Sequence, residues 1–132
     1  LNIDINKNKI LKNLNFIDTG ASLSSTGECV EYVKKIVKNN SIDLSQAADI
    51  AKQMLEALEQ EDASKFNQAI LANQELLEKI GVVPDEVIKK IKKLSEQGFV
   101  AKISGSGSVR GGAAGIIMYQ NKKTKSKNAI EG

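Results

Sequence analysis

Apolar residues recur three and four positions apart through the middle of the chain, which is the spacing of helices with one buried face. Four stretches show this spacing: residues 25–38, 45–60, 62–80 and 84–97. Ser25 and Glu28 fit a capping box at the start of the first stretch. Gly81 and Gly98 follow the third and fourth stretches as stop signals, and Pro84 suits the start of the fourth. The pattern therefore predicts four helices.

The pattern is different on either side of these helices. Short apolar runs typical of strands occur at residues 15–17, 99–103 and 113–119. Residues 104–112, between the last two runs, are rich in glycine and serine and are expected to form a loop. Helices combined with a few strands from distant parts of the chain predict an α+β fold with a small sheet. We expect one domain over residues 1–119 and a Lys-rich, disordered tail over 120–132.

Composition narrows the possible functions. The chain has 132 residues, which predicts one domain, and a net charge of +3 with 4% aromatic residues is a weak basis for binding nucleic acid. Histidine is absent, which removes the commonest metal ligand and the usual base of a nucleophilic triad. No apolar run approaches the roughly 18 residues of a membrane span, and the single cysteine fits a reducing cytoplasm. We therefore expect a cytoplasmic protein with no metal site of its own and no membrane or nucleic-acid partner.

The stretch FIDTGASLSST at residues 16–26 raises a specific alternative. Asp-Thr-Gly after an apolar run is the motif of retroviral-type aspartic proteases, in which two carboxylates share one proton. This chain has one such motif, so a protease would have to be a homodimer that uses Asp18 from each copy. Such enzymes are almost entirely β, whereas helical pattern follows here. We expect Asp18, Thr19 and Gly20 to form a turn after a strand, with Asp18 in a structural role.

The second informative stretch is AKISGSGSVRGGAAGII at residues 101–117. Its glycines allow consecutive backbone N–H groups to converge on an anion, and Arg110 adds positive charge. The stretch lacks the Gly-Lys-Ser/Thr ending of a Walker A loop, and a strand follows where a dinucleotide-binding loop needs a helix. An anion-binding loop is the functional interpretation, while a plain hairpin loop and an engineered Gly-Ser linker remain open.

Three stretches, in this order, resemble the C-terminal half of the GHMP kinases, the family of galactokinase, homoserine kinase, mevalonate kinase and phosphomevalonate kinase. FIDTGASLSSTGECVEYVKK (16–35) is similar to the family's strand, small-residue turn and helix that opens on Ser-Thr. ILANQELLEKIGVVPDEVIKKI (70–91) is similar to its Asn-Gln helix, glycine and Pro-led helix. AKISGSGSVRGGAAGII is similar to its third motif. Among these enzymes the mevalonate kinases are the most similar.

The resemblance implies a ferredoxin-like α+β domain, with four helices packed on a small antiparallel sheet. It also implies an N-terminal domain as partner, which holds the main ATP loop, the catalytic Asp and a Lys. We identify no catalytic residue in this chain and expect it to be inactive alone. The complete enzyme would use ATP and Mg²⁺ to phosphorylate mevalonate, or a similar small molecule, in isoprenoid biosynthesis. A non-catalytic anion-binding module and a homodimer both remain open.

The matching motifs also imply residues of the site. Ser25 and Thr26 would lie near the substrate, at a helix N-terminus that suits an anion, although a purely structural cap at Ser25 is the alternative. The phosphate loop would be supported by residues of the glycine-rich stretch: Ser104, Gly105, Ser106, Gly107 and Arg110. Ser106 departs from the family's usual Ala, and Val109-Arg110 lengthens the loop. No acid occurs at 104–107, which favours a kinase over a diphosphomevalonate decarboxylase.

Asn73 interrupts the apolar stripe of the third predicted helix, where a polar side chain needs a partner. The resemblance suggests that Asn73 faces the glycine-rich loop or the active site. A hydrogen bond between its side chain and the backbone is the alternative.

Overall fold

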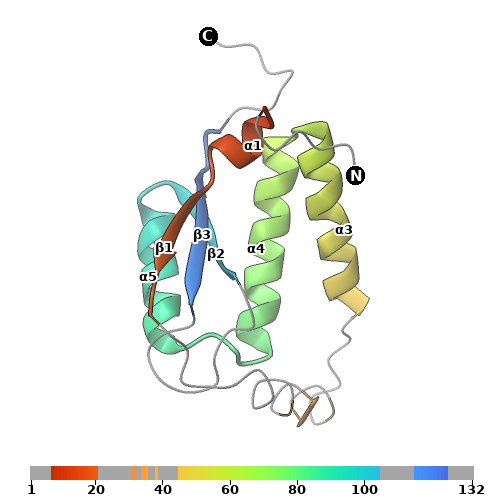
Figure 1. Cartoon of the computed structure of the whole chain (residues 1–132). Coiled ribbons are helices and arrows are strands. Elements are labelled where there is room, and N and C mark those ends of the chain that lie inside the picture. The colour runs from red at the N-terminus through yellow and green to blue at the C-terminus, as the bar shows by residue number, and fades with distance from the viewer. Residues whose placement is uncertain are drawn as a thin grey trace.

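The computed structural model describes residues 7–20, 31, 34–35, 38, 45–104 and 115–124. Within these residues the elements are α1 (Lys9–Lys12), β1 (Asn15–Asp18), α3 (Ser45–Gln60), α4 (Ala63–Lys79), α5 (Asp85–Glu96), β2 (Phe99–Ser104) and β3 (Ile116–Asn121), as Figure 1 shows. The described part of the chain is therefore an α+β domain with four helices and a three-stranded antiparallel sheet. This is the predicted fold class.

The sheet joins segments from opposite ends of the chain. Its strand order is β1-β3-β2, and both pairings are antiparallel. Ile17 of β1 lies opposite Ile117 of β3, which in turn lies opposite Ile103 of β2. The three aliphatic side chains therefore share one face of the sheet, because successive residues of a strand point to opposite faces.

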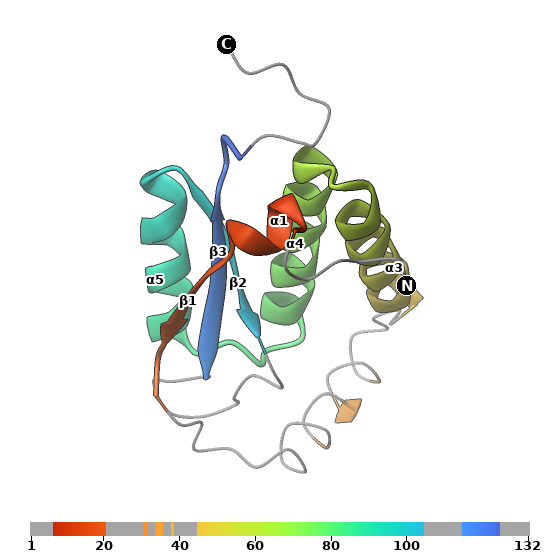
Figure 2. The same cartoon turned by 45° about the horizontal axis from the view of Figure 1, so that its top comes forward.

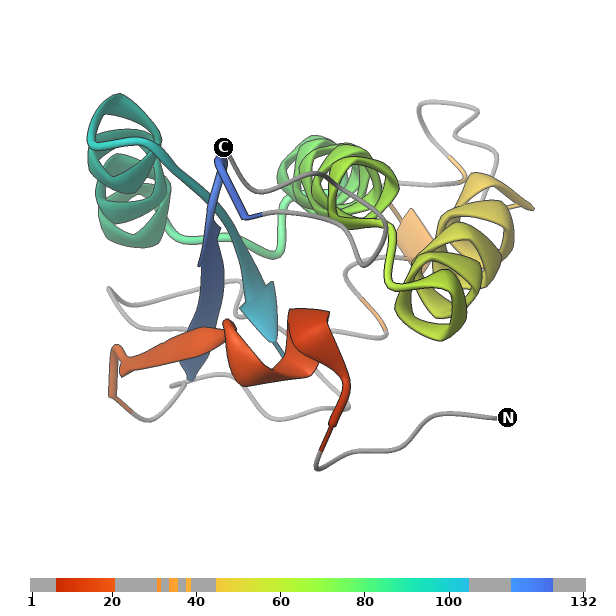
Figure 3. The same ribbon diagram turned by 90° about the horizontal axis from the view of Figure 1, so that it is seen from above.

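The helices cover the sheet on different sides. Figures 1 and 3 show α5 on one side of the sheet, α4 alongside β2, and α3 outside α4. Figure 2 shows α1 close to α4, at the end of the sheet where β1 begins. Ile10 of α1 packs with Phe66 of α4 against Val100 of β2, whereas α5 packs on the opposite face. The sheet is thus enclosed most fully around β2 and β3.

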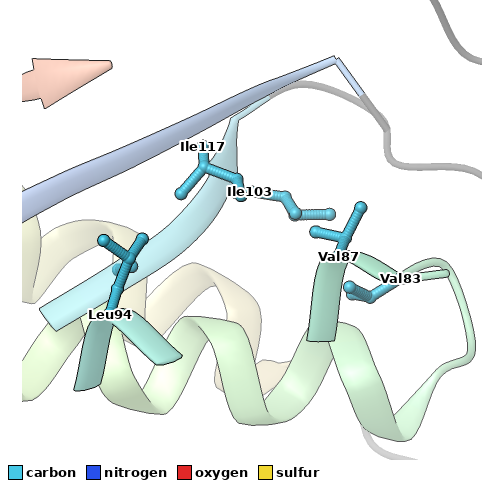
Figure 4. Close-up of a cluster of buried hydrophobic side chains, with 6 residues drawn as sticks. Val83, Val87, Leu94, Ile103 and Ile117 are labelled. Atoms are coloured by element: carbon cyan, nitrogen blue, oxygen red, sulfur yellow. The ribbon is translucent and has the colours of Figure 1, made fainter. Parts of the chain in front are cut away.

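The main core lies between α5 and the sheet. Val87 and Leu94 of α5 pack against Ile103 and Ile117 of the sheet, with Val83 at the entry to the helix (Figure 4). A second cluster lies around Phe66, and a third joins α3 to α4 around Ile50 and Leu76. Each such side chain contributes roughly 1.5–3 kcal/mol when it is fully buried. The core is almost wholly aliphatic, as the scarcity of aromatic residues predicts.

Local sequence signals set the ends of the long helices. Asp62 is the N-cap of α4, and its side chain accepts a hydrogen bond of 3.0 Å from the Lys65 backbone N–H. Gly81 follows the C-cap of α4 with φ +80°, and Gly98 follows α5 with φ +96°. Left-handed backbone of this kind suits glycine, so both stop signals are confirmed. Pro84, expected to start α5, is its N-cap.

Three features differ from the sequence prediction. Helix α1 was not predicted, because four residues are too short to show a helical period; Asn8 caps it by accepting from the Ile10 and Leu11 backbone N–H groups. Ser104, assigned to the loop, is the last residue of β2. The final strand, predicted over residues 113–119, is Ile116–Asn121. Its residue Gln120 is fully buried and donates to the Asn67 side chain at 2.6 Å.

Some predictions fall where little or nothing is described. Of the first predicted helix, residues 31, 34, 35 and 38 are helical, and its remainder lies outside the described residues. Most of the predicted tail also lies outside them. None of the described helices is long and apolar enough to cross a membrane.

Candidate functional site

The candidate site begins at one end of the sheet, where all three strands meet. Asp18, Ile116 and Ser104 lie side by side across β1, β3 and β2. The chain leaves this end of the sheet after β1 toward residues 21–30 and after β2 toward residues 105–114. These are the two segments that carry most of the predicted site residues. Both segments therefore leave the sheet at the same end, although they are far apart in sequence.

The Asp-Thr-Gly stretch connects β1 to Gly115, which lies between the predicted glycine-rich loop and β3. Thr19 donates its backbone N–H at 2.7 Å and its hydroxyl at 2.5 Å to the Gly115 carbonyl. Gly115 in turn donates its N–H to the Gly20 carbonyl at 3.1 Å. These three hydrogen bonds hold the residue that ends the loop against the turn after β1.

Asp18 has the structural role that the sequence predicts. Its exposed side chain accepts a hydrogen bond of 2.8 Å from the Gly20 backbone N–H, two residues later, which closes the turn. A carboxylate used in this way stabilises the local backbone. Together with the helices that follow, this geometry removes the basis for reading Asp18 as a protease carboxylate.

The start of the loop is held by a different set of side chains. Gln74 of α4 accepts a hydrogen bond of 2.9 Å at its Oε1 from the Ile103 backbone N–H. The Lys102 ammonium donates to the Ile103 carbonyl. Gln74 is 3% exposed, and its Nε2 donates to Glu78 at 3.2 Å. Sequence reasoning assigned no role to Gln74 or Lys102; the available signals were the Asn-Gln pair of the second motif and a lysine within a buried strand.

Lys102 is a half-buried charged residue without a carboxylate partner among the described residues. It is half-buried on β2, and burial lowers the pKa of its ammonium below the usual lysine value. Among the described residues no carboxylate lies within ion-pair distance of it. In this part of the chain no group of Cys, Asp or Glu is arranged to hold a metal ion, so no step is assigned to Mg²⁺ through these residues.

Within the described part of the chain, the Asn73 side-chain oxygen does not make the backbone hydrogen bond that is one of the two interpretations of this residue. Its Oδ1 is buried and has no hydrogen-bond partner within the described structure. A buried carbonyl oxygen without a donor is uncommon in folded proteins and calls for a partner. Asn73 therefore holds an available acceptor on α4, beside the residue that contacts β2.

The structure describes only part of the predicted site. Ser104 lies at the end of β2, where it is exposed and pairs with Ile116. The other predicted site residues lie outside the described residues: Ser25, Thr26, Gly105, Ser106, Gly107 and Arg110. Their roles therefore stay predictions, while the points at which their segments join the sheet are established.

Comparison with known families decides the classification. The model of the GHMP kinases C terminal family matches residues 54–130, which is more than half of the chain. The chain belongs to the GHMP kinase family. The match runs from within α3 past the end of β3, and it includes the second and third motifs but not the first. Comparison with curated proteins finds no match, and neither does comparison with solved structures.

Membership of the GHMP kinase family indicates the type of reaction to which this domain contributes. GHMP kinases are ATP-dependent enzymes that transfer a phosphoryl group to a small molecule, and this chain corresponds to their C-terminal domain. In this GHMP kinase domain, the Thr19 hydroxyl, the Ile103 N–H and the Lys102 ammonium at the loop ends all hydrogen-bond within the domain. These contacts fix the residues on either side of the loop.

Proposed function

We propose that this chain is the substrate-side domain of a mevalonate-kinase-like enzyme, which phosphorylates mevalonate in isoprenoid biosynthesis. The observation that carries the proposal is the contact between Thr19 and Gly115, with both Thr19 donors on one carbonyl. It joins the end of the glycine-rich loop to the segment that leads to Ser25 and Thr26. A segment that supports the phosphate loop and a segment that binds the substrate would have to start from neighbouring points in this way.

Each segment has a proposed role in this reaction. Ser25 and Thr26 contact the acceptor through hydroxyl and backbone N–H groups at a helix N-terminus, where the helix dipole favours negative charge. Ser104, Gly105, Ser106 and Gly107 support the phosphate loop, and Arg110 adds positive charge. The work of these groups is to bind and orient the reactants, which in phosphoryl transfer is a large part of catalysis.

The remaining parts of the active site belong to the proposed N-terminal partner domain. That domain would supply the main ATP loop, the catalytic Asp and its Lys, while ATP would donate the phosphoryl group and Mg²⁺ would neutralise its negative charge. The choice of mevalonate as acceptor rests on the similarity of the three quoted stretches to mevalonate kinases. The lack of an acid at residues 104–107 supports a kinase rather than a decarboxylase.

The proposal is tested by ADP release from the full-length protein, measured in a coupled assay with mevalonate, homoserine and galactose as separate acceptors. We expect turnover with mevalonate to exceed the other two. Turnover with homoserine or galactose, and none with mevalonate, would overturn the mevalonate assignment and leave the family unchanged.

A titration of the 132-residue chain with ATP and with mevalonate separates the proposal from a self-sufficient binding module. Because the main ATP loop is assigned to the partner domain, we expect weak ATP binding by this chain alone. Tight binding of ATP without the partner domain would favour the anion-binding module instead.

A further inference from the structure

The face of the sheet opposite α5 is covered at one end only. Ile17, Ile117 and Ile103 face α5, so the residues on either side of them along each strand point to the opposite face. On that opposite face, Val100 and Gln120 are buried beside α1 and α4. The register places six further side chains on it in two rows, Phe16, Met118 and Lys102 in the first and Asp18, Ile116 and Ser104 in the second. These six residues form what we term the open face.

The open face exposes a group of apolar side chains. Phe16 is 61% exposed and Ile116 is 43% exposed. Met118 lies opposite Phe16 on the neighbouring strand and two residues from Ile116 on its own strand, so the three side chains are contiguous. Single exposed apolar residues are ordinary on a protein surface, whereas a contiguous group of them marks a contact surface.

Two opposite charges lie at diagonal corners of the open face. Lys102 stands at the β2 end of the first row, and Asp18 stands at the β1 end of the second. In the part of the chain that the structure describes, neither of them forms an ion pair. Lys102 donates to the Ile103 carbonyl and Asp18 accepts from the Gly20 N–H, but an ammonium and a carboxylate each take several hydrogen bonds. Both charges therefore retain the capacity for a charged partner.

This layout is self-complementary. When two open faces meet about a two-fold axis that lies between them, perpendicular to the line from Lys102 to Asp18, Lys102 of each copy meets Asp18 of the other. The same rotation brings the Phe16 side chains of the two copies close together. The strands of the two sheets then cross at a steep angle, which is one of the usual ways in which sheets pack. Contacts that use the same patch on both copies are the commonest kind in homo-oligomers.

We infer that the open face is the contact surface of a homodimer, in which Lys102 and Asp18 form two reciprocal ion pairs around an apolar centre. A second copy fits better than a partner of one charge sign, because an anionic membrane would attract Lys102 but repel Asp18. The patch is small, so the dimer is weak and depends on protein concentration. The inference does not rest on the proposed function, because it involves neither the acceptor nor the nucleotide.

Sedimentation velocity of the full-length protein over a concentration series tests the dimer. We expect the parent protein to dimerise and Phe16→Ser to raise the dissociation constant roughly tenfold, because buried aromatic side chains dominate small interfaces. The matched control is Leu55→Ser, which changes a 43% exposed apolar residue of α3 and should dimerise like the parent. A parent protein that stays monomeric throughout the series would overturn the inference, and so would an equal loss of dimer in the two variants.

Charge reversal tests the ion pairs directly. Lys102→Glu and Asp18→Lys each place like charges together in both pairs of their own dimer, so each should raise the dissociation constant at least about a hundredfold. A mixture of the two variants should form a heterodimer with near-parent affinity, because both pairs again join opposite charges. If the mixture stays monomeric while circular dichroism shows both variants to be folded, the proposed contact is wrong. If either variant fails to fold, the comparison of Phe16→Ser with Leu55→Ser decides the matter.

Discussion

Thr19 and Gly115 lie 96 positions apart in the chain, yet the Thr19 hydroxyl and backbone N–H both donate to the Gly115 carbonyl. The contact joins the turn after β1 to the start of β3, at the end of the sheet where the two predicted site segments begin. Asp-Thr-Gly therefore has a structural role rather than a catalytic one: it holds the residue that follows the glycine-rich loop.

The first prediction concerns the Thr19 hydroxyl. Thr19→Val keeps the shape of the side chain and the backbone hydrogen bond but removes the hydroxyl donor. We expect the free energy of unfolding to fall by about 1 kcal/mol, the usual net value of one hydrogen bond. Urea unfolding measures this change, with Thr124→Val at the other end of β3 as the control. An equal loss in both variants would contradict a specific role for Thr19.

The second prediction compares two residues of the opening motif by their effect on activity. Asp18→Asn keeps a side-chain oxygen that accepts from the Gly20 N–H, so ADP release by the full-length protein should stay near the parent rate. Thr26→Ala removes a hydroxyl assigned to the substrate and should lower the rate roughly tenfold or more. If Asp18→Asn abolished turnover and Thr26→Ala did not, the roles assigned to them would be reversed.

The third prediction concerns two glycines with left-handed backbone. Gly115 has φ +81° and Gly98 has φ +96°, and a built Cβ would meet only the Ser104 carbonyl at 3.8 Å in the first case and nothing within 4 Å in the second. Alanine at either position therefore strains the backbone rather than creating a clash, with a loss of about 1–2 kcal/mol in stability. Thermal unfolding should show similar losses for both variants.

The same pair separates stability from function. Gly115 ends the glycine-rich loop, whereas Gly98 follows α5 at the other end of β2. We therefore expect only Gly115→Ala to raise KM for ATP in the full-length protein. A matching rise in Gly98→Ala would show that the effect comes from stability alone.

The fourth prediction concerns the pH dependence of stability from Lys102. Burial lowers the pKa of Lys102 below its ordinary value of 10.5, so between the lowered pKa and 10.5 the unfolded chain binds a proton that the folded chain has released. Stability therefore rises with pH across that window, and the penalty of the buried charge is present in full below it. Urea unfolding at a series of pH values up to 10.5 should show this slope.

Substitution isolates the source of that slope. Lys102→Met removes the titrating group, so the contribution of Lys102 to the rise should disappear. Lys92→Met, an exposed lysine on α5, should leave that contribution in place. If the rise of stability with pH persisted in Lys102→Met and disappeared in Lys92→Met, Lys102 would not be its source.

Features that depend on neighbouring residues could be predicted from the sequence. Asp62 caps α4 through the backbone of Lys65, and Gly81 and Gly98 end helices by adopting positive φ. The turn at Asp18 closes on Gly20, two residues away. Each of these depends on side-chain or backbone chemistry within a few positions, which is why local patterns were sufficient.

The candidate site could be predicted only in part. The glycine-rich loop and the Ser-Thr helix start stand out by composition, but Gln74 looks like any polar residue on a helix. Its role depends on Ile103, 29 positions later, whose N–H needs an acceptor because β2 lies at the edge of the sheet formed by the described strands. Likewise the sequence pattern places Gln120 in the tail, and its burial against Asn67, 53 positions earlier, follows from the sheet register.

The sequence by itself determined the class of fold, the long helices with their ends, the three strands and the family motifs, because these follow from periodicity and local backbone preferences. The tertiary structure alone decided which strands are neighbours, that Thr19 holds Gly115, and that Gln74 and Lys102 hold Ile103. The physical reason is that an unpaired backbone group takes whichever partner the packing brings to it. Packing is a property of the whole chain rather than of any stretch within it.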